Sequence, residues 1–332
     1  MYSIKKNKKL DFKKEFYILY SSTNINFVLL TQEMEMRNLI SILLGITIFY
    51  TVPVSGQVKD TLEFWGEDVL VVASKIITLQ GDISLPLTTV ENKDIKKTRD
   101  FSVLDILDRE IPGLSVTKKG VIGYGVASGS AGSINIRGIG GKPNTDVLIL
   151  IDGRPEFMGM MGHPLPDVYL VGNVKKIEVI KGPASTLFGS NAMGGVINII
   201  TRKREKPGMS TTFESKYGSF NTFENILLNE GKINNFFYNF SFSKIKTDGE
   251  RNYSDYKNSS VSLKLGYEFN KNYEVIFSAN NTKFKIFDPG VISKPVINHW
   301  YDIERNWFNL SLNNKNKNVT GAIRIHANTG NH

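Results

Sequence analysis

The feature that most constrains this fold is a strict alternation of apolar and polar side chains in the second half of the chain. Val261, Leu263, Leu265, Tyr267 and Phe269 alternate with small or polar residues. The same period of two runs through residues 209–217 and 236–242, and in weaker form through residues 273–279, 307–313 and 319–327. This period places the apolar side chains on one face of a β-strand. The second half therefore predicts a series of antiparallel strands.

The connections between these strands alternate in length. Residues 270–272 form a tight polar turn, whereas residues 248–257 and 287–306 are long polar excursions. Aromatic-rich strands with short turns on one side and long loops on the other are typical of a transmembrane β-barrel whose apolar residues face lipid. A soluble β-sandwich with one solvated face is the alternative that the periodicity leaves open.

Residues 62–206 have a different character. Ser102 can cap a helix with an apolar side, which ends before Pro112 and Gly113. Strands are expected at residues 114–117, 134–136, 147–151, 176–180 and 195–201. Residues 120–141 contain eight glycines, a density that suits close backbone packing. This half predicts a small α+β globule, with a boundary near residue 206.

An uncharged apolar segment, residues 38–58, follows Arg37, and its densest part is too short for a typical membrane-spanning helix. Pro53 and the small residues after it supply a cleavage signal. We therefore expect a signal peptide at residues 36–56, with a membrane anchor as the alternative. Because such a signal normally opens a chain, residues 1–35 are interpreted as an upstream extension.

Composition excludes several classes of function. With no cysteine among 332 residues there is no disulfide or thiolate metal site, and the four histidines are too scattered for a zinc-protease helix. The net charge of +9 is spread along the chain, which argues against a nucleic-acid partner. Phosphate-binding, nucleophile-elbow and dinucleotide motifs are missing. We expect no enzyme, no cofactor and no metal site.

Strand number sets a further expectation. Residues 207–332 hold about seven strands, whereas a barrel wide enough to enclose a globule needs about 22. An open sheet edge in lipid leaves backbone polar groups unpaired. The sequence is therefore expected to be the front part of a longer protein.

Four ordered blocks of the globule resemble the plug domain of TonB-dependent outer-membrane receptors. They are residues 134–138 (INIRG), 147–153 (VLILIDG), 176–185 (KIEVIKGPAS) and 194–201 (GGVINIIT). The resemblance implies an α+β plug domain at residues 81–206, followed by antiparallel transmembrane β-barrel strands at residues 207–332, which form an incomplete barrel. It also implies the bacterial outer membrane as the location. In these blocks the glycines Gly138, Gly153, Gly182 and Gly195 are expected to mark turns and close packing.

Within residues 57–80, one short apolar segment resembles the TonB box, through which the partner protein TonB would bind. A free β-rich strand suits pairing with the sheet edge of a partner. The alternative is an internal strand of the plug. The segment comprises Asp68, Val69, Leu70, Val71, Val72, Ala73 and Ser74.

The resemblance also implies contacts between the plug and the barrel. The positions matching Arg137 and Lys181 face acidic barrel residues in the family, and Glu178 belongs to the same group. This sequence has lysine at position 181, where arginine is commoner in the family. A guanidinium that can bind a carboxylate through two hydrogen bonds is therefore replaced by a compact ammonium group.

A loop rich in methionine lies where family plugs rise toward the ligand. Met158, Met160, Met161 and His163 are therefore candidates for ligand contact. Their side chains suit a flexible apolar contact better than direct metal coordination. A glycine-hinged loop packed on the inner wall is the alternative.

The function implied is uptake of a scarce nutrient, an iron chelate of the siderophore type above all, energised through TonB. The expected partners are TonB, outer-membrane lipid and a small-molecule or metal-chelate ligand. Two alternatives remain: a passive recognition or adhesion barrel, and a non-functional truncated receptor.

Overall fold

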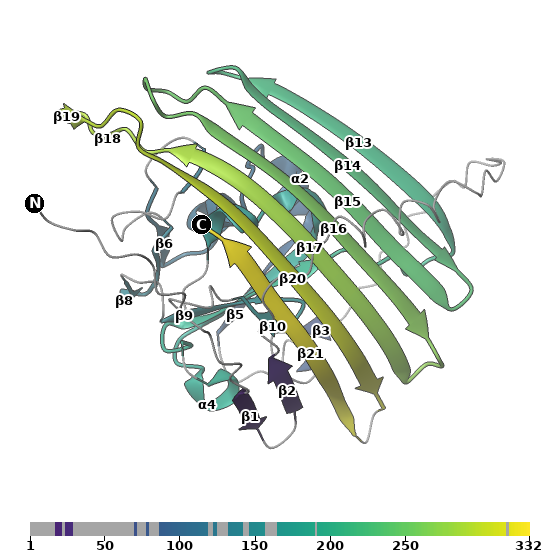
Figure 1. Cartoon of the computed structure of the whole chain (residues 1–332). Helices are drawn as coiled ribbons and strands as arrows, with labels where there is room; N and C mark the ends of the chain where they lie inside the picture. The colour runs from purple at the N-terminus through teal and green to yellow at the C-terminus, as the bar shows by residue number, and fades with distance from the viewer. Residues whose placement is uncertain are drawn as a thin grey trace, which may run out of the picture.

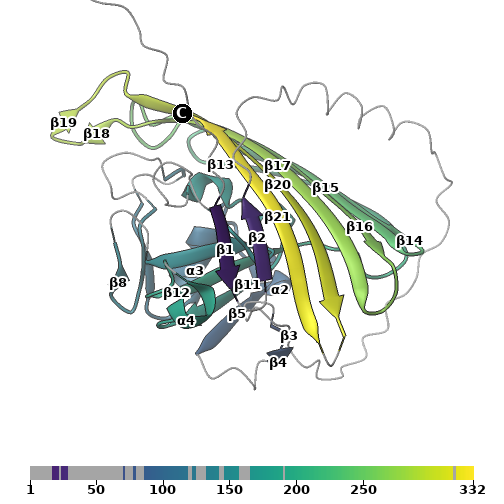
Figure 2. The ribbon, with the colours of Figure 1, turned by 60° about the horizontal axis from the view of Figure 1, so that its bottom comes forward.

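The computed structural model describes residues 86–118, 122–124, 132–141, 146–156, 165–189, 191–316 and 319–332, together with the backbone of four short strands before residue 80. These residues form two bodies, a globule (residues 86–206) and a curved sheet (residues 208–332), which we name the wall. Figure 1 and Figure 2 show the globule lying against the concave face of the wall.

The globule is built around a five-stranded sheet in the order β10-β9-β12-β11-β5. Its pairs are antiparallel except β9 with β12, which run parallel. The strands are β5 (Leu87–Glu91), β9 (Val147–Ile151), β10 (Arg154–Pro155), β11 (Val174–Lys181) and β12 (Gly195–Thr201). A second sheet joins β6 (Leu114–Val116), β7 (Ile134–Ile136) and β8 (Ile139–Gly140). The helices are α2 (Asn92–Lys97), α3 (Val103–Glu110), α4 (Ser185–Phe188), η2 (Pro166–Val168) and η3 (Val171–Asn173).

The predicted helix and strands of the globule are confirmed. The Ser102 hydroxyl accepts a hydrogen bond from the Leu104 backbone N–H and caps α3. The apolar side of this helix is buried in a core that also contains Ile149, Ile177 and Ile197 of the central sheet. The four block glycines have positive φ angles, from 76° at Gly153 to 151° at Gly195, which glycine adopts without strain.

The wall consists of long antiparallel strands in chain order, and the edge of its last strand pairs in parallel with β2 (Asn24–Val28), next to β1 (Tyr17–Ser21). Its strands are β13 (Gly208–Gly218), β14 (Thr222–Ile233), β15 (Phe236–Thr247), β16 (Tyr256–Glu268), β17 (Tyr273–Phe287), β20 (Trp300–Lys315) and β21 (Thr320–Asn331). The long loop after β17 carries a hairpin of β18 (Gly290–Val291) and β19 (Lys294–Pro295).

The alternation of side chains sorts the two faces of the wall as predicted. Outward positions are apolar and exposed, as at Phe213 (67%) and Leu310 (46%). Inward positions are polar and buried, as at Asn239 (0%) and Ser278 (3%). An α+β globule followed by an antiparallel sheet with an apolar outer face is therefore confirmed.

The strands exceed the predicted segments in two places. β17 continues to Phe287, and β20 begins at Trp300, so the predicted loop at residues 287–306 shrinks to residues 288–299. Polar outward positions near the loop ends, such as Lys283 and Glu304, hid this continuation. β14 was missed because the buried inward residues Ile226 and Leu228 interrupt the alternation, and Ile226 lies against Gly172 of the globule.

Several predictions fall outside the described residues. These include the signal peptide at residues 36–56 and most of the segment at residues 68–74. Of that segment, β3 (Leu70–Val71) pairs with β4 (Thr78–Leu79). Within the described part of the chain, no helix has the length and hydropathy needed to cross a bilayer.

Candidate functional site

The candidate site is the interface between the globule and the concave face of the wall. Its contacts change in character along the strands. An apolar tier lies toward the long loops, a hydroxyl-rich tier lies in the middle, and an ion-pair tier lies at the short turns.

In the apolar tier, Leu165 of the globule packs with inward-facing wall residues. These are Ile245, Tyr256, Phe284, Ile286 and Ile303. Gly123 lies so close to the wall that a Cβ there would be 2.7 Å from Tyr256 Cδ2. Asn258 Nδ2 donates to the Asp167 backbone oxygen at 2.7 Å. A glycine and a backbone acceptor therefore set how closely the two bodies approach.

Tyr124 holds the segments of the globule next to this tier together through two hydrogen bonds. The Tyr124 backbone N–H donates to the Asp167 carboxylate at 3.0 Å, and the Tyr124 hydroxyl donates to Asp105 at 2.5 Å. Burial, reinforced by the neighbouring Asp105 charge, raises the pKa of Tyr124 well above its ordinary value. The hydroxyl therefore stays protonated and remains a donor.

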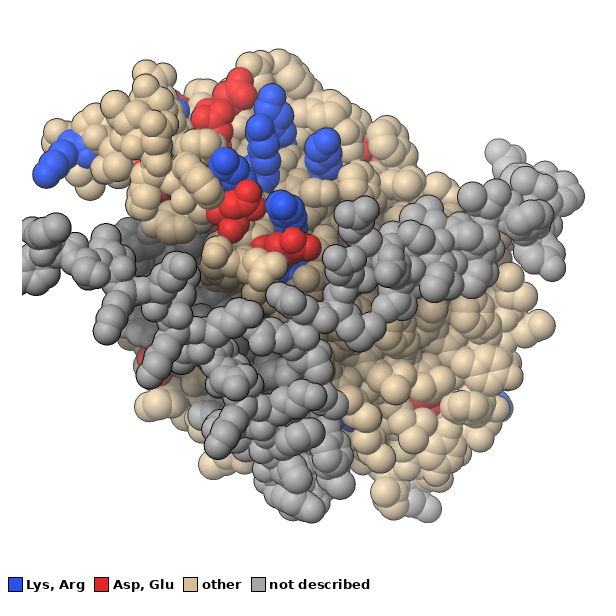
Figure 3. All heavy atoms as spheres, viewed as in Figure 1, with Lys and Arg blue, Asp and Glu red and all other residues tan. Residues whose placement is uncertain are grey.

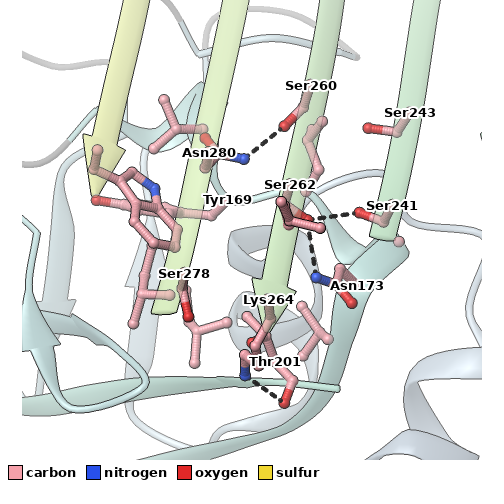
Figure 4. Close-up of a pocket in the computed structure, with 18 residues that line it drawn as sticks. Tyr169, Asn173, Thr201, Ser241, Ser243, Ser260, Ser262, Lys264, Ser278 and Asn280 are labelled. Atoms are coloured by element: carbon pink, nitrogen blue, oxygen red, sulfur yellow. Dashed lines mark hydrogen bonds between the residues drawn. The ribbon is translucent and has the colours of Figure 1, made fainter. Parts of the chain in front are cut away.

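The middle tier encloses a cavity of about 60 Å³ between the two bodies, shown in Figure 4. Its wall side is lined by small hydroxyl side chains: Ser241, Ser243, Ser260, Ser262 and Ser278. Asn173 Nδ2 of the globule donates to Ser262 Oγ at 3.0 Å, and Ser262 also bonds to Ser241 at 2.8 Å. The cavity exceeds the roughly 10–15 Å³ that one water requires. This tier is therefore a polar seam that water can enter.

A tight turn of the globule presents charged groups to the wall beside this cavity. Asp152 and Gly153 both have positive φ angles, 50° and 76°, and join β9 to β10 as a two-residue hairpin turn. Asp152 Oδ2 pairs with Lys264 Nζ of β16 at 2.9 Å and accepts from the Thr201 hydroxyl at 2.7 Å. One carboxylate thus ties β12 of the globule to the wall.

The residues that follow this turn, Arg154 and Glu156, form a buried ionic cluster with Arg305 of the wall. Arg154, which is 1% exposed, pairs with Glu156 at 2.5 Å and lies 4.5 Å from the Trp307 ring centroid. Arg154 Nη1 also donates to Asn328 of β21 at 3.1 Å. Arg305 of β20 approaches the other Glu156 oxygen at 3.7 Å. Glu156 therefore neutralises one guanidinium from each body.

The ion-pair tier contains Lys203, which belongs to the segment that connects the globule to the wall. Lys203, two residues after the end of β12, pairs with Glu268 at 3.0 Å and with Glu274 at 2.6 Å, at the turn between β16 and β17. Its Nζ lies 4.3 Å from the Phe237 ring centroid. Gly266 makes room for that ring, since a Cβ there would be 2.0 Å from Phe237 Cζ.

The charge of this lysine is stabilised. Burial alone would lower the pKa of Lys203, but the hydrogen bonds to Glu274 and Glu268 outweigh it and raise the pKa. Lys232 and Lys315 pair with the same carboxylates at 2.6 and 2.9 Å. We name Lys203, Lys232, Lys315, Glu268 and Glu274 the rim clamp.

The residues predicted to join plug and barrel lie in three different surroundings. Arg137 is exposed at the turn between β7 and β8, with a φ angle of 52°. Glu178 is fully buried in β11 and pairs with Lys176 at 2.7 Å, inside the globule. Lys181 ends β11 and is half-buried. The described wall does not test their roles, and their contact with the barrel stays a prediction.

The other predicted site residues lie outside the described part of the chain. They are Met158, Met160, Met161 and His163, with Asp68, Val69, Val72, Ala73 and Ser74 of the expected partner-binding segment. Among the residues that are described, no cluster of three or more metal-ligating side chains occurs.

Arg154, Glu156 and Lys203 were missed from the sequence. The Asp-Gly turn signals that a hairpin presents the side chains after it. The wall partners, however, lie about 60 to 175 residues away in the chain, as in the separation of 174 residues between Arg154 and Asn328. No local pattern predicts such pairs.

Comparison with known proteins identifies the globule. Residues 80–196 match the family model of the TonB-dependent receptor plug domain. The globule is therefore similar to the plug domain of TonB-dependent receptors.

Solved structures extend the likeness from the plug to the wall. The ferric yersiniabactin uptake receptor FyuA from Yersinia pestis matches 70% of this chain at 18% identity, with a TM-score of 0.57. The ferric preacinetobactin receptor BauA from Acinetobacter baumannii matches 74% at 15% identity, with a TM-score of 0.59. The chain spans 39% and 38% of these proteins, so the shared feature is the fold of the plug and the first barrel strands.

The buried cluster yields a prediction. Replacing Glu156 by Gln removes the buried carboxylate that both Arg154 and Arg305 approach. We expect the free energy of unfolding to fall by about 3–5 kcal/mol, measured by urea unfolding in detergent. The control is Asp94→Asn at the exposed Lys97 pair, which should change by less than about 0.5 kcal/mol. Equal losses of unfolding free energy in Glu156→Gln and Asp94→Asn would contradict the role of Glu156 as the counter-charge of the buried cluster.

The rim clamp yields a second prediction. Lys203→Met should lower the free energy of unfolding by about 1–3 kcal/mol, whereas Lys206→Met, at an exposed position nearby, should have little effect. Because the folded-state pKa of Lys203 lies above its ordinary 10.5, the difference is fully present below pH 10.5 and is lost as the pH rises through the folded value. Urea unfolding at several pH values measures it. A difference that disappears near pH 7 would refute this account.

Proposed function

We propose that the protein is a receptor that takes up a scarce nutrient across the outer membrane and is energised through TonB. The observation that carries this proposal is a matched plug domain that packs on the inner face of an outward-apolar sheet, with a polar seam in the middle of the interface. A seam of hydroxyl groups can exchange its partners for water at little cost. The plug can therefore be shifted without unfolding the wall.

We further propose an iron chelate of the siderophore type as the cargo. Support comes from the similar structures, which include a ferric yersiniabactin uptake receptor and a ferric preacinetobactin receptor. Met158, Met160, Met161 and His163 are proposed to contact this cargo. Arg137, Glu178 and Lys181 are proposed to face the rest of the barrel.

Coupling between cargo and TonB follows from linkage. Cargo that binds one plug position more tightly shifts the plug toward that position, only as far as the difference in affinity allows. We propose that residues 68–74 then pair as an added strand with TonB. The rim clamp includes Lys203, two residues after the end of β12, and keeps the C-terminal end of the plug attached while its N-terminal side moves.

Deletion of residues 68–74 tests the proposed energised uptake. Cells that express the variant from the complete gene should bind a set of radio-iron-labelled siderophores as the parent does but accumulate almost none. The control is a deletion of equal length within the segment preceding it, residues 57–63. Unchanged uptake after loss of residues 68–74 would favour a passive recognition barrel instead.

A reversible cross-link tests movement of the plug. Asn173→Cys with Ser262→Cys places two thiols where the side chains now lie 3.0 Å apart, in a chain with no other cysteine. We expect oxidised cells to lose uptake by at least about tenfold, to keep siderophore binding, and to recover with a reductant.

The matched control for this cross-link is Ser241→Cys with Ser262→Cys, which joins two wall strands at a directly opposed pair and leaves the plug free. It should take up iron at the parent rate. If the plug-to-wall cross-link forms quantitatively and uptake continues, the plug does not move along this seam.

A further inference from the structure

One polar side chain lies in the middle of the apolar strand β12 of the plug. Asn198 is fully buried, between the buried residues Ile197 and Ile199. A buried amide costs free energy unless its donors and its acceptor are hydrogen-bonded. An amide in this strand therefore needs a role that an apolar side chain would not fulfil.

The oxygen of this amide holds the turn between β9 and β10. Asn198 Oδ1 accepts a hydrogen bond from the Gly153 backbone N–H at 3.1 Å. The preceding N–H, that of Asp152, donates to the Ile199 backbone oxygen at 2.9 Å. The two central N–H groups of a two-residue turn have no partner within the hairpin. β12 supplies a partner for both of them.

The nitrogen of the same amide bonds to a buried carboxylate. Asn198 pairs in register with Glu178 of β11, and its Nδ2 donates to Glu178 Oε2 at 3.5 Å. Glu178 is fully buried, and its other oxygen pairs with Lys176 at 2.7 Å. A carboxylate in an ion pair accepts hydrogen bonds and donates none. Asn198 is therefore fixed with its nitrogen toward β11 and its oxygen toward the turn.

The turn that Asn198 holds carries two contacts to the wall. Asp152 Oδ2 pairs with Lys264 Nζ of β16 at 2.9 Å, and Arg154 Nη1 donates to Asn328 of β21 at 3.1 Å. Strands β17 and β20 lie between these two wall strands. One turn therefore joins the plug to a broad part of the wall, and the orientation of the turn decides whether both contacts form.

The lysine of the first contact is an inward charge in the middle of the wall. Figure 3 shows that the described outer surface of the wall is mostly uncharged below the upper ends of the strands. Lys264 is 7% exposed on the concave side, and among the described residues it makes its ion pair with Asp152. A buried ammonium that loses its counter-charge must be hydrated instead. Loss of the turn's orientation therefore opens the cavity beside Lys264 to water.

We propose that Asn198 is a positioning residue for the contact between plug and wall. It orients the turn through the Gly153 N–H. Asp152 then reaches Lys264, and Arg154 reaches β21. Loss of the amide oxygen releases both contacts from one point inside the plug. This role rests on the proposed function, in which the plug shifts along the wall.

The test uses a thiol reporter in the cavity between plug and wall. Ser278→Cys introduces one thiol on β17, directly opposite Lys264, in a chain without cysteine. The position lines the cavity and is 3% exposed, so a maleimide reaches it only when the plug separates from the wall. We measure the labelling rate of the full chain in a non-ionic detergent. Adding Asn198→Leu should raise this rate at least about tenfold.

The matched control is Asn92→Leu in the same reporter chain. Asn92 Nδ2 donates to the Val174 backbone oxygen at 3.0 Å, at the opposite edge of the plug sheet from β9 and β10. This variant also loses one hydrogen bond of the plug, but it should label at the parent rate. Equal acceleration by Asn92→Leu and Asn198→Leu would overturn the proposal, since loss of any such bond would then have the same effect.

Coupling to Lys264 separates positioning from general destabilisation. Lys264→Met should also raise the labelling rate, and adding Asn198→Leu to it should raise the rate no further, because both changes remove the same contact. Effects that multiply would refute the positioning role. The exchange of Glu178→Gln with Asn198→Asp should restore slow labelling, since an amide then donates to a carboxylate that still accepts from the turn. Fast labelling of this exchanged pair would contradict the proposal.

Hydrogen–deuterium exchange in β11 and β12 shows whether each variant keeps a folded plug. If Asn198→Leu loses this protection, Asn198→Ser takes its place, because a hydroxyl on this shorter side chain does not reach the turn. Labelling of Asn198→Ser at the parent rate would also refute the role. The measurement needs neither cargo nor TonB. A failure of iron uptake therefore leaves the labelling result standing, and a negative labelling result leaves the receptor function standing.

Discussion

The structure depends on one constraint, which is that the wall must present opposite chemistries on its two faces. Backbone donors and acceptors in a bilayer have to be paired within the protein, which only long strands in register or helices achieve. With a side-chain period of two, the same strand then offers Phe240 to the outside and Asn239 and Ser241 to the inside. The globule therefore meets hydroxyl and amide groups over most of the wall.

As a result, the contacts between plug and wall differ in strength from one tier to the next. The apolar tier around Leu165 and the charged cluster around Glu156 fix the position of the plug. Between them lies the seam of serines around the cavity, where each contact is weak and replaceable by water. The rim clamp at Lys203 holds the end of the plug nearest the wall in sequence. A force applied at the N-terminal end of the plug would therefore act on the contacts of the seam and the Glu156 cluster before those of the rim clamp.

The sequence was informative where the determinants are local. The cap at Ser102, the Asp-Gly turn after β9 and the alternation in β15 and β16 are each set by neighbours in the chain, and each was predicted. The limits of β17 and β20 were not, because the outward lysines and acids at their upper ends resemble a polar loop. The contacts of Arg154, Glu156 and Lys203 were not predicted either, because sheet curvature brings their partners to them from distant strands.

The central claim is that plug and wall meet at an interface whose middle tier is a weak polar seam, so that the plug loses its structure before the wall does. Hydrogen–deuterium exchange of the chain in detergent, at increasing urea, tests it most directly. The account predicts that the amides of β9, β11 and β12 lose protection at a lower urea concentration than those of β15, β16 and β17. A single transition shared by both sets of strands would contradict it.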